Sequence, residues 1–206
     1  MIISIDGNIG SGKSTLLDAL SKNTNIHAEY FPEPLHIWGD TLERYFEDKK
    51  TWACPLTIDI LAAFDRVRHS THPHQIVERS PLACIDVFTE ILKHDGLLTK
   101  EELHIIQEYA SVFKWVPDVI IYLDVDPLTC QERMRLRQRS GEDIPYDELR
   151  ALDYRYKKVL DAAPCTVHIV EQSPSETREA FHARMSHFVQ KIIRESSIAT
   201  TKAITT

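Results

Sequence analysis

The sequence predicts a three-layer α/β protein, in which helices cover both faces of a parallel sheet of about five strands. Strand-like and helix-like patterns alternate from one end of the chain to the other, an order typical of parallel sheets. The first strand leads into a glycine-rich turn and a helix, and one later strand is apolar throughout, as in strands covered on both faces. Without a linker or an internal repeat, residues 1–195 are expected to form a single domain.

The expected strands are short and mostly apolar. They are Ile2–Ile5, Ile26–Phe31, Gln75–Val77, Val119–Leu123 and Thr166–Val170. The fourth is an uninterrupted apolar run, which indicates a strand buried in the middle of the sheet.

Helices are expected where apolar residues recur at helical spacing or where capping residues mark a start. They are expected over Ser14–Leu20, Leu56–Val67, Pro81–Leu92 and Leu103–Phe113. Asp126-Pro127 is typical of a further helix start, with the aspartate as N-cap and the proline in the first turn.

A last helix is expected after the fifth strand. Ser173-Pro174-Ser175-Glu176 has the form of a capping box. The apolar face of this helix would hold Phe181, Met185, Phe188 and Ile192. From Ser196 onward the residues are small and polar, which predicts a disordered tail over 196–206.

Composition argues against several classes of protein. With 24 basic and 31 acidic side chains, the formal net charge is −7, which disfavours binding to nucleic acid. No apolar run reaches the length of a membrane span, and because the first strand begins so early we expect no targeting peptide. The cysteines are scattered without a CxxC pair, so we expect reduced thiols in a cytoplasmic protein.

A phosphate-binding loop follows the first strand. Gly7-Asn8-Ile9-Gly10-Ser11-Gly12-Lys13-Ser14, followed by Thr15, satisfies the pattern G-x-x-x-x-G-K-[ST] between a strand and a helix. Backbone N–H groups of such a loop surround the phosphates of ATP, the lysine reaches the β- and γ-phosphates, and the serine ligates Mg²⁺. The fold is therefore expected to be that of a P-loop NTPase. An ordinary glycine-rich turn with an exposed lysine is the alternative.

The loop leaves the reaction open, and other features of the chain narrow it. A regulatory GTPase would need an N-K-x-D segment, which the sequence lacks, and motors and large ATPases need longer chains. A small-molecule kinase is the simplest interpretation.

Further polar residues occur where strands are expected to end, the edge at which α/β proteins bind ligands. Glu33-Pro34 follows the second strand, and Glu78-Arg79-Ser80 ends the third. Arginines recur at every second position through Arg133, Arg135, Arg137 and Arg139. Each feature alone is typical of solvated turns and helices, so only their joint order is informative.

That joint order resembles the deoxynucleoside kinase family, which comprises thymidine, deoxycytidine and deoxyguanosine kinases and includes the herpesvirus-type thymidine kinases. The matching segments are Asp6–Thr15, Glu33-Pro34-x-x-x-Trp38, Trp52-Ala53-x-Pro55, Glu78-Arg79-Ser80, Ile120–Leu123 and an arginine-rich lid up to Glu142 and Pro145. The loop is generic, but the whole set, spread over residues 1 to about 160, is specific to the family.

The resemblance implies an enzyme that transfers the γ-phosphate of ATP to the 5′-hydroxyl of a deoxynucleoside, as a homodimer without a nucleic-acid or membrane partner. It implies that Glu33 is the general base and that Arg79 aligns Glu33 with the 5′-oxygen. Glu78 would ligate Mg²⁺ beside Ser14. Arg133, Arg137 and Arg139 would be the lid arginines, while Arg135 has no counterpart.

The resemblance also implies a nucleoside pocket. Trp38 and Phe88 would wall the base, and Tyr45 with Glu142 would bind the sugar 3′-hydroxyl, with Phe46 as the alternative to Tyr45. The lid is one residue shorter than in the family between Glu142 and Pro145.

Three positions bear on the choice of base. Thr57 stands where the family commonly has a glutamine that binds the base with two hydrogen bonds. Phe64 and Cys84 stand where the deoxycytidine- and purine-preferring members have an arginine–aspartate pair. A neutral pair predicts a preference for thymidine, or for pyrimidine deoxynucleosides generally. Loss of the glutamine leaves a broader specificity open, with Asp59 as a further hydrogen-bond acceptor.

Two rival interpretations remain at this point. A nucleoside monophosphate kinase shares the loop, the sheet and an arginine-rich lid, but it needs a basic site for the phosphate of its acceptor. A non-catalytic ATP-binding module would have no need for an acid, an arginine and lid arginines together.

Overall fold

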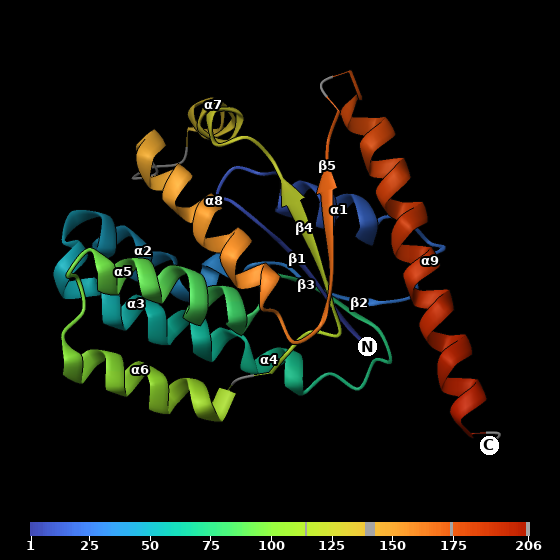
Figure 1. Ribbon diagram of the computed structural model, residues 1–206, viewed down its shortest axis with the longest axis horizontal. Helices are drawn as coiled ribbons and strands as arrows, with labels where there is room; N and C mark the ends of the chain where they lie inside the picture. The colour runs from blue at the N-terminus through green and yellow to red at the C-terminus, as the bar shows by residue number, and fades with distance from the viewer. Residues whose placement is uncertain (114, 139–142, 174, 205–206) are drawn as a thin grey trace.

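The computed structural model describes residues 1–113, 115–138, 143–173 and 175–204, and it leaves out the side chains of residue 113 and of residues 198–204. Five strands form one parallel sheet in the order β2-β3-β1-β4-β5 (Figure 1). The strands are β1 Ile2–Gly7, β2 Glu29–Phe31, β3 Gln75–Glu78, β4 Val119–Asp124 and β5 Thr166–Glu171. The predicted α/β class and parallel sheet are confirmed.

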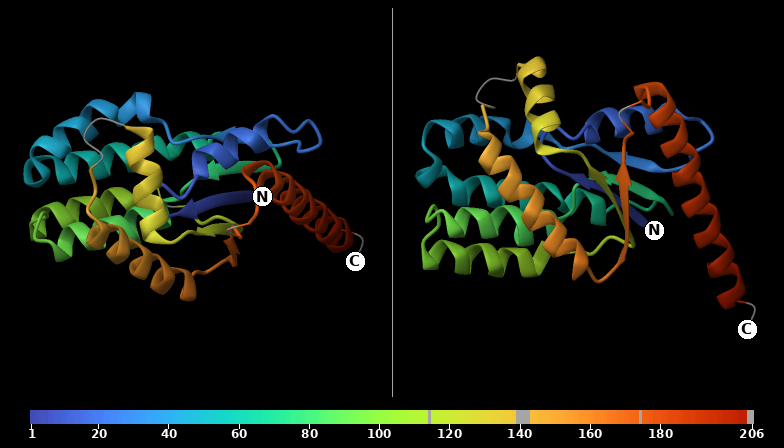
Figure 2. Two further views of the ribbon diagram at one scale, coloured as in Figure 1. Left: turned by 90° about the horizontal axis from the view of Figure 1, so that it is seen from above. Right: turned by 45° about the horizontal axis from the view of Figure 1, so that its top comes forward.

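Helices cover both faces of the sheet (Figures 1 and 2). They are α1 Lys13–Ser21, α2 Leu35–Glu47, α3 Lys49–Ala63, α4 Asp65–Arg68, the π-helical segment η1 Ala83–Thr89, α5 Glu90–His94, α6 Lys100–Phe113, α7 Pro127–Arg137, α8 Tyr146–Asp161 and α9 Arg178–Ile204. Among the described helices, none combines the length and the apolar character needed to cross a bilayer.

Two apolar layers hold the sheet between the helices. On one face, Ile3 and Ile5 of β1 pack with α1 and α9, including Leu16 and Met185, and all four side chains are fully buried. On the other face, Ile120 and Tyr122 of β4 pack against η1, α7 and α8. Because alternate residues of one strand serve opposite layers, nearly every position of β1 and β4 is buried.

The strand order places the start of the P-loop between two neighbours. β1 lies between β3 and β4, with Ile5 beside Glu78 and Asp6 beside Tyr122. The chain leaves β1 in one direction toward α1 and leaves β4 in the other toward α7, so a crevice opens at the carboxyl end of the sheet. This crevice contains the candidate site.

Several predicted boundaries differ from the structure. The second strand begins at Glu29, because the Ile26 side chain packs into the core before the strand starts. Helix α3 begins at Lys49, where the Asp48 side chain accepts a hydrogen bond from the Thr51 N–H, and it contains Pro55. Where one helix was predicted over residues 81–92, the structure has two successive segments, η1 and α5.

The start of the last helix was predicted too early. Helix α9 begins at Arg178, and the Thr177 hydroxyl accepts a hydrogen bond from the Ala180 N–H. Instead, the Ser173 carbonyl accepts a hydrogen bond from the Glu176 N–H, which closes a turn before the helix. Helix α9 runs to Ile204, past the start of the predicted tail, whose disorder stays a prediction.

The N-cap of α7 generates a stability prediction. Asp126 Oδ1 accepts a hydrogen bond from the Leu128 N–H at 3.3 Å, as the sequence predicted. We expect Asp126→Ala to lower the free energy of unfolding by about 1 kcal/mol, because one N–H group loses its partner. Thermal unfolding without ligands should show a Tm lower by about 2–4 °C.

The matched control is Asp161→Ala, which removes an exposed carboxylate at the end of α8. This variant should unfold within about 0.5 kcal/mol of wild type. An unchanged Tm in Asp126→Ala would show that the capping bond contributes nothing to stability.

Candidate active site

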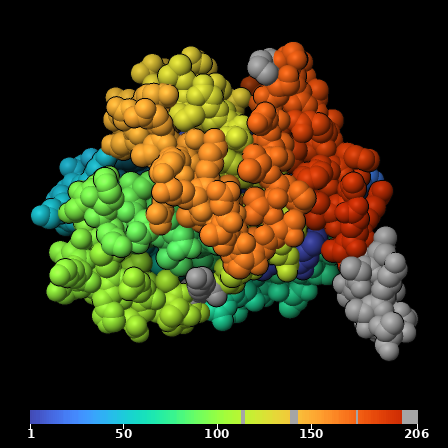
Figure 3. All heavy atoms as spheres, viewed as in Figure 1, coloured from blue at the N-terminus to red at the C-terminus, as the bar shows by residue number. Residues whose placement is uncertain are grey.

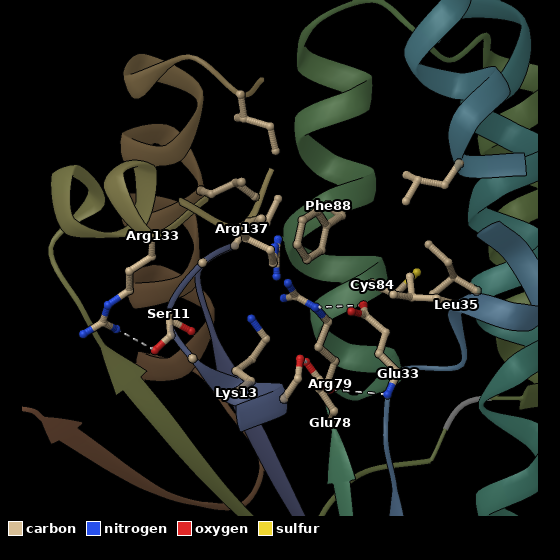
Figure 4. Close-up of a pocket in the computed structure, with 18 of the residues that line it drawn as sticks. Ser11, Lys13, Glu33, Leu35, Glu78, Arg79, Cys84, Phe88, Arg133 and Arg137 are labelled. Carbon is tan, nitrogen blue, oxygen red and sulfur yellow. Dashed lines mark hydrogen bonds and ion pairs between the residues drawn. The ribbon is translucent and has the colours of Figure 1, made fainter. Parts of the chain in front are cut away.

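A cavity of about 910 Å³ opens at the carboxyl ends of the strands. Its walls come from the P-loop, the segments that follow β2 and β3, helices α2 and α3, segment η1, and helices α7, α8 and α9. Figure 4 shows Lys13 and Ser11 on the side of the P-loop and Glu33, Leu35 and Cys84 on the opposite side, with Arg79 between them. The cavity therefore joins the predicted phosphate site to the predicted nucleoside pocket.

The P-loop takes the conformation that its glycines allow. Gly10 and Gly12 have φ angles of +81° and +97°, in the left-handed region that favours glycine. A Cβ atom on Gly10 would lie 2.5 Å from the Cys130 carbonyl oxygen of α7. Residues 9–15 line the cavity, whereas the buried Asn8 side chain donates a hydrogen bond to the Leu149 carbonyl of α8 at 2.7 Å.

Lys13 lies deep in this loop. Its side chain is buried, and Nζ donates a hydrogen bond to the Asn8 carbonyl at 2.7 Å. Burial, with the nearby positive charge of Arg79, lowers the pKa of Lys13 to about 8. This ammonium group can bind phosphate oxygens at neutral pH, but it loses its charge as the pH rises through about 8.

Two oxygen-bearing side chains meet beside the loop. The Ser14 hydroxyl donates a hydrogen bond to Glu78 Oε1 at 2.7 Å. The other carboxylate oxygen of Glu78 accepts a longer bond, 3.4 Å, from the Glu33 N–H. Glu78 thus connects the P-loop to the segment that carries Glu33.

Arg79 and Glu33 form an ion pair at the centre of the site. Arg79 Nε donates to Glu33 Oε1 at 3.2 Å, and both side chains line the cavity. Arg79 Nη1 donates to the Gly7 carbonyl at 3.2 Å and to the Tyr156 hydroxyl at 2.5 Å. The guanidinium carbon lies 4.8 Å from the centre of the Phe88 ring, a distance typical of a cation–π contact.

The charge of Arg79 is secured by its neighbours. Burial alone would lower the pKa of this group, but Tyr156, Glu33, Glu78 and Asp6 together raise it above its ordinary value. Arg79 therefore stays charged at neutral pH.

The predicted nucleoside pocket is assembled beyond this pair. Its lining includes Trp38, Tyr45, Phe46, Thr57, Phe64, Cys84 and Phe88. Burial raises the pKa of the Cys84 thiol to about 12, so this position is neutral like Phe64. Both Tyr45 and Phe46 reach the cavity, so the structure leaves both alternatives open.

Thr57 and Asp59 of α3 lie in different surroundings. Thr57 lines the cavity, and its hydroxyl donates its hydrogen to the Ala53 carbonyl at 2.8 Å. Asp59 accepts a hydrogen bond from Thr41 of α2 at 2.7 Å, and it lies outside the residues that line the cavity. Of the two, only Thr57 is placed to contact a bound base.

One of the predicted lid arginines, Arg133, contacts the P-loop from α7. Arg133 Nη1 donates to the Ser11 carbonyl at 3.2 Å (Figure 4). Arg133 Nη2 donates to the Gln172 side chain at 3.0 Å. Arg137 also lines the cavity. The predicted roles of Arg139 and Glu142 fall on residues outside the described part of the chain.

Other charged residues line the cavity that the sequence analysis did not identify. Lys49 of α3 and Glu148 of α8 form an ion pair at 3.3 Å across its mouth, near Tyr45. Burial and the Glu148 charge raise the pKa of Tyr45 to about 12. The neutral Gln172, which bonds to Arg133, also lines the cavity, as do Arg178 and His182 of α9. These residues belong to separate elements, so no local spacing pattern could identify them.

Comparisons with known proteins place the chain in a family. A family model described as deoxynucleoside kinase matches residues 3–194. Protein 029R of Invertebrate iridescent virus 3 is 32% identical over 175 residues, which cover 82% of this chain and 87% of the relative. A thymidine kinase of Ictalurid herpesvirus 1 (strain Auburn) is 30% identical, covering 79% and 75%. Deoxycytidine kinase 2 of Gallus gallus is 30% identical, covering 77% and 73%.

The shifted pKa of Lys13 generates a pH prediction. Because burial lowers this pKa to about 8, Lys13 is charged below that pH and neutral above it. We expect the affinity for ATP, measured in EDTA by fluorescence titration, to fall as the pH rises through about 8.

The control is Lys13→Met, which keeps the length of the side chain and removes its charge. This variant should bind ATP weakly and with little change between about pH 6.5 and about pH 9.5, where an ordinary lysine stays charged. Wild-type affinity that is constant over the same range would contradict the lowered pKa.

Proposed function

The chain belongs to the deoxynucleoside kinase family, and we propose that it transfers the γ-phosphate of ATP to the 5′-hydroxyl of a deoxynucleoside, with thymidine and other pyrimidine deoxynucleosides preferred. The observation that carries the proposal is the ion pair of Glu33 and Arg79, which lies between the P-loop and a pocket of aromatic side chains. A carboxylate in this place would lie between the phosphate donor on the P-loop and the acceptor in the aromatic pocket.

The donor end supplies charge stabilisation. ATP phosphates would bind the N–H groups of residues 9–15 and the ammonium group of Lys13, with Arg133 and Arg137 approaching from α7. Negative charge on the transferring phosphoryl group would be stabilised by these cations, which are held in place before the reaction.

The oxygens of Ser14 and Glu78 suit a magnesium ion. They are hard ligands 2.7 Å apart beside Lys13, and Mg²⁺ is typically held by one or two protein oxygens together with substrate phosphates. When bound, the ion would bridge and neutralise phosphate oxygens.

The acceptor end supplies the base and the alignment. Glu33 would accept the proton of the 5′-hydroxyl as the oxygen attacks the γ-phosphorus. Arg79 uses Nε and Nη1 for described protein partners, which leaves Nη2 to hold the 5′-oxygen. Catalysis in phosphoryl transfer is mostly positioning and charge stabilisation, so a carboxylate of ordinary strength suffices.

The choice of base follows from the neutral lining of the pocket. A buried charge without a partner is costly, and Phe64 with a protonated Cys84 supplies none. Thr57 gives its hydrogen to Ala53, so its oxygen can only accept, and the N3–H of thymine is a donor that fits. The exocyclic amine of cytosine, adenine or guanine would find no charged partner at Phe64 or Cys84.

The rival monophosphate kinase lacks support in the pocket. Arg79 and Lys49 are the cations on the acceptor side among the described lining residues, and each is paired with a carboxylate. An acceptor phosphate would have to displace Glu33 or Glu148. The homodimer, the cytoplasmic location and the lack of a nucleic-acid partner stay predictions from the sequence.

Glu33→Gln tests the general base. The amide keeps the size of the side chain but cannot take the proton, so we expect turnover to fall by about 10²–10⁴-fold. Binding of the nucleoside, measured by calorimetry, should change little. Glu29→Gln is the control, since Glu29 is an exposed carboxylate on the strand that precedes Glu33. Near-normal turnover in Glu33→Gln beside an inactive Glu78→Gln would assign the base to Glu78.

A substrate panel tests the choice of base. We expect kcat/KM for thymidine to exceed that for deoxyadenosine and deoxyguanosine under identical ATP and Mg²⁺ concentrations, with deoxycytidine between them. Thr57→Gln restores an amide that can form two hydrogen bonds, and should raise the thymidine value about 5- to 100-fold. Thr57→Val removes the hydroxyl at similar shape and separates its loss from the gain of the amide. A purine that clearly exceeds thymidine in the wild type would contradict the argument from Phe64 and Cys84.

A further inference from the structure

Helix α8 contacts three separate parts of the site. Its Leu149 carbonyl accepts the bond from Asn8 of the P-loop, its Glu148 pairs with Lys49 at the mouth of the cavity, and its Tyr156 bonds to Arg79. The space-filling view shows α8 running over one face of the molecule, between α7 and the green helices of the acceptor side (Figure 3). One rigid element thus sets the spacing of the donor loop, the pocket and the central arginine.

Tyr156 is held firmly on the inner side of this helix. Its side chain is 1% exposed, and its ring lies edge-on to Phe88 at 6.1 Å and 5.3 Å from the ring of Tyr122. Burial raises the pKa of Tyr156 above its ordinary value, so the hydroxyl remains an uncharged hydrogen-bond partner. A ring fixed by two aromatic neighbours gives its hydroxyl a fixed position.

Arg79 requires such fixed partners. Its φ angle of +65° lies in the left-handed region, which a non-glycine residue occupies only when its surroundings impose it. Nη1 has two hydrogens, and the Gly7 carbonyl and the Tyr156 hydroxyl account for both. Because the guanidinium is planar, fixing Nε and Nη1 also fixes the direction of Nη2.

We propose that Tyr156 is a positioning residue for phosphoryl transfer, which holds the Arg79 guanidinium so that Nη2 points at the attacking oxygen while Nε holds Glu33. This inference rests on the proposed function. Tyr156 touches no substrate atom in this scheme, and it lies outside the residues that line the cavity. Its effect passes through Arg79, and through α8 it ties the position of Arg79 to that of the P-loop.

The test compares two buried tyrosines. Tyr156 lies on α8, and Tyr122 of β4 bonds to a residue of α8. Tyr156→Phe keeps the ring and removes the bond to Arg79. Tyr122→Phe removes a hydroxyl of the same chemistry, which bonds to Asp153 of α8 at 3.1 Å and makes no described contact with Arg79. Both variants are checked by thermal unfolding, and kcat and the dissociation constants of ATP and thymidine are measured separately.

We expect kcat to fall about 10- to 100-fold in Tyr156→Phe, because a displaced catalytic group loses that much in rate. The two dissociation constants should stay within about three-fold of wild type, and Tyr122→Phe should keep near-normal kcat. Equal losses of kcat in both variants, or a loss of binding that matches the loss of rate, would assign the effect to packing of α8 and overturn the proposal. Normal kcat in Tyr156→Phe would overturn it as well.

A second measurement does not depend on turnover. The Nε–H signal of Arg79 in a nitrogen-15 NMR spectrum, assigned by its absence in Arg79→Lys, should exchange with water at least about ten-fold faster in Tyr156→Phe than in Tyr122→Phe. Equal exchange in the two variants would overturn the positioning role. Wild-type protein without turnover on any deoxynucleoside would instead refute the proposed function, and the NMR comparison would still decide the role of Tyr156.

Discussion

The buried charge of Arg79 is the constraint on which the rest of the site depends. A guanidinium removed from water is stable only when its hydrogens are paired and its charge is balanced, since leaving such a group unpaired costs about 3–5 kcal/mol. Its partners come from the end of β1, from the segment after β2 and from α8. These segments are far apart in the chain, and the parallel sheet brings them together because β3, which Arg79 directly follows, pairs with both β1 and β2.

Around Arg79 the protein gathers charges that balance one another before any ligand binds. Lys13 and Arg79 share a buried region with the carboxylates of Asp6, Glu33 and Glu78. Asp6 is buried with one oxygen bonded to Ser4, and burial raises its pKa. The cost of burying the two cations is thus offset within the protein. A bound triphosphate can then use cations that are already desolvated and oriented, which is the condition for strong electrostatic catalysis.

Sequence reasoning identified the parts of the site that are contiguous in the chain. The P-loop needs its glycines and lysine at fixed positions, and the order of Glu33 and Arg79 along the chain resembles that of a known family, so these residues could be predicted. Helix α2 could also have been found, because Leu35, Trp38, Leu42 and Tyr45 recur at helical spacing. Lys49 with Glu148, and Arg79 with Tyr156, could not. Each pair joins elements about 80 to 100 positions apart, and only the packing of α8 against the acceptor side creates them.

Thr57 shows how a short side chain changes what the pocket can recognise. A side-chain hydroxyl on a helix can bond the carbonyl one turn back, and Thr57 does so with Ala53. The oxygen is then held against its own helix and presents only lone pairs to the cavity. Under the proposed function, recognition of the base would come mainly from shape and from stacking on the cavity-lining Trp38, Phe64 and Phe88, which stabilise apolar area without reading every edge. Under the proposed function such a pocket would discriminate between bases only modestly, since one methylene group in an apolar pocket changes binding by about 1–3 kcal/mol.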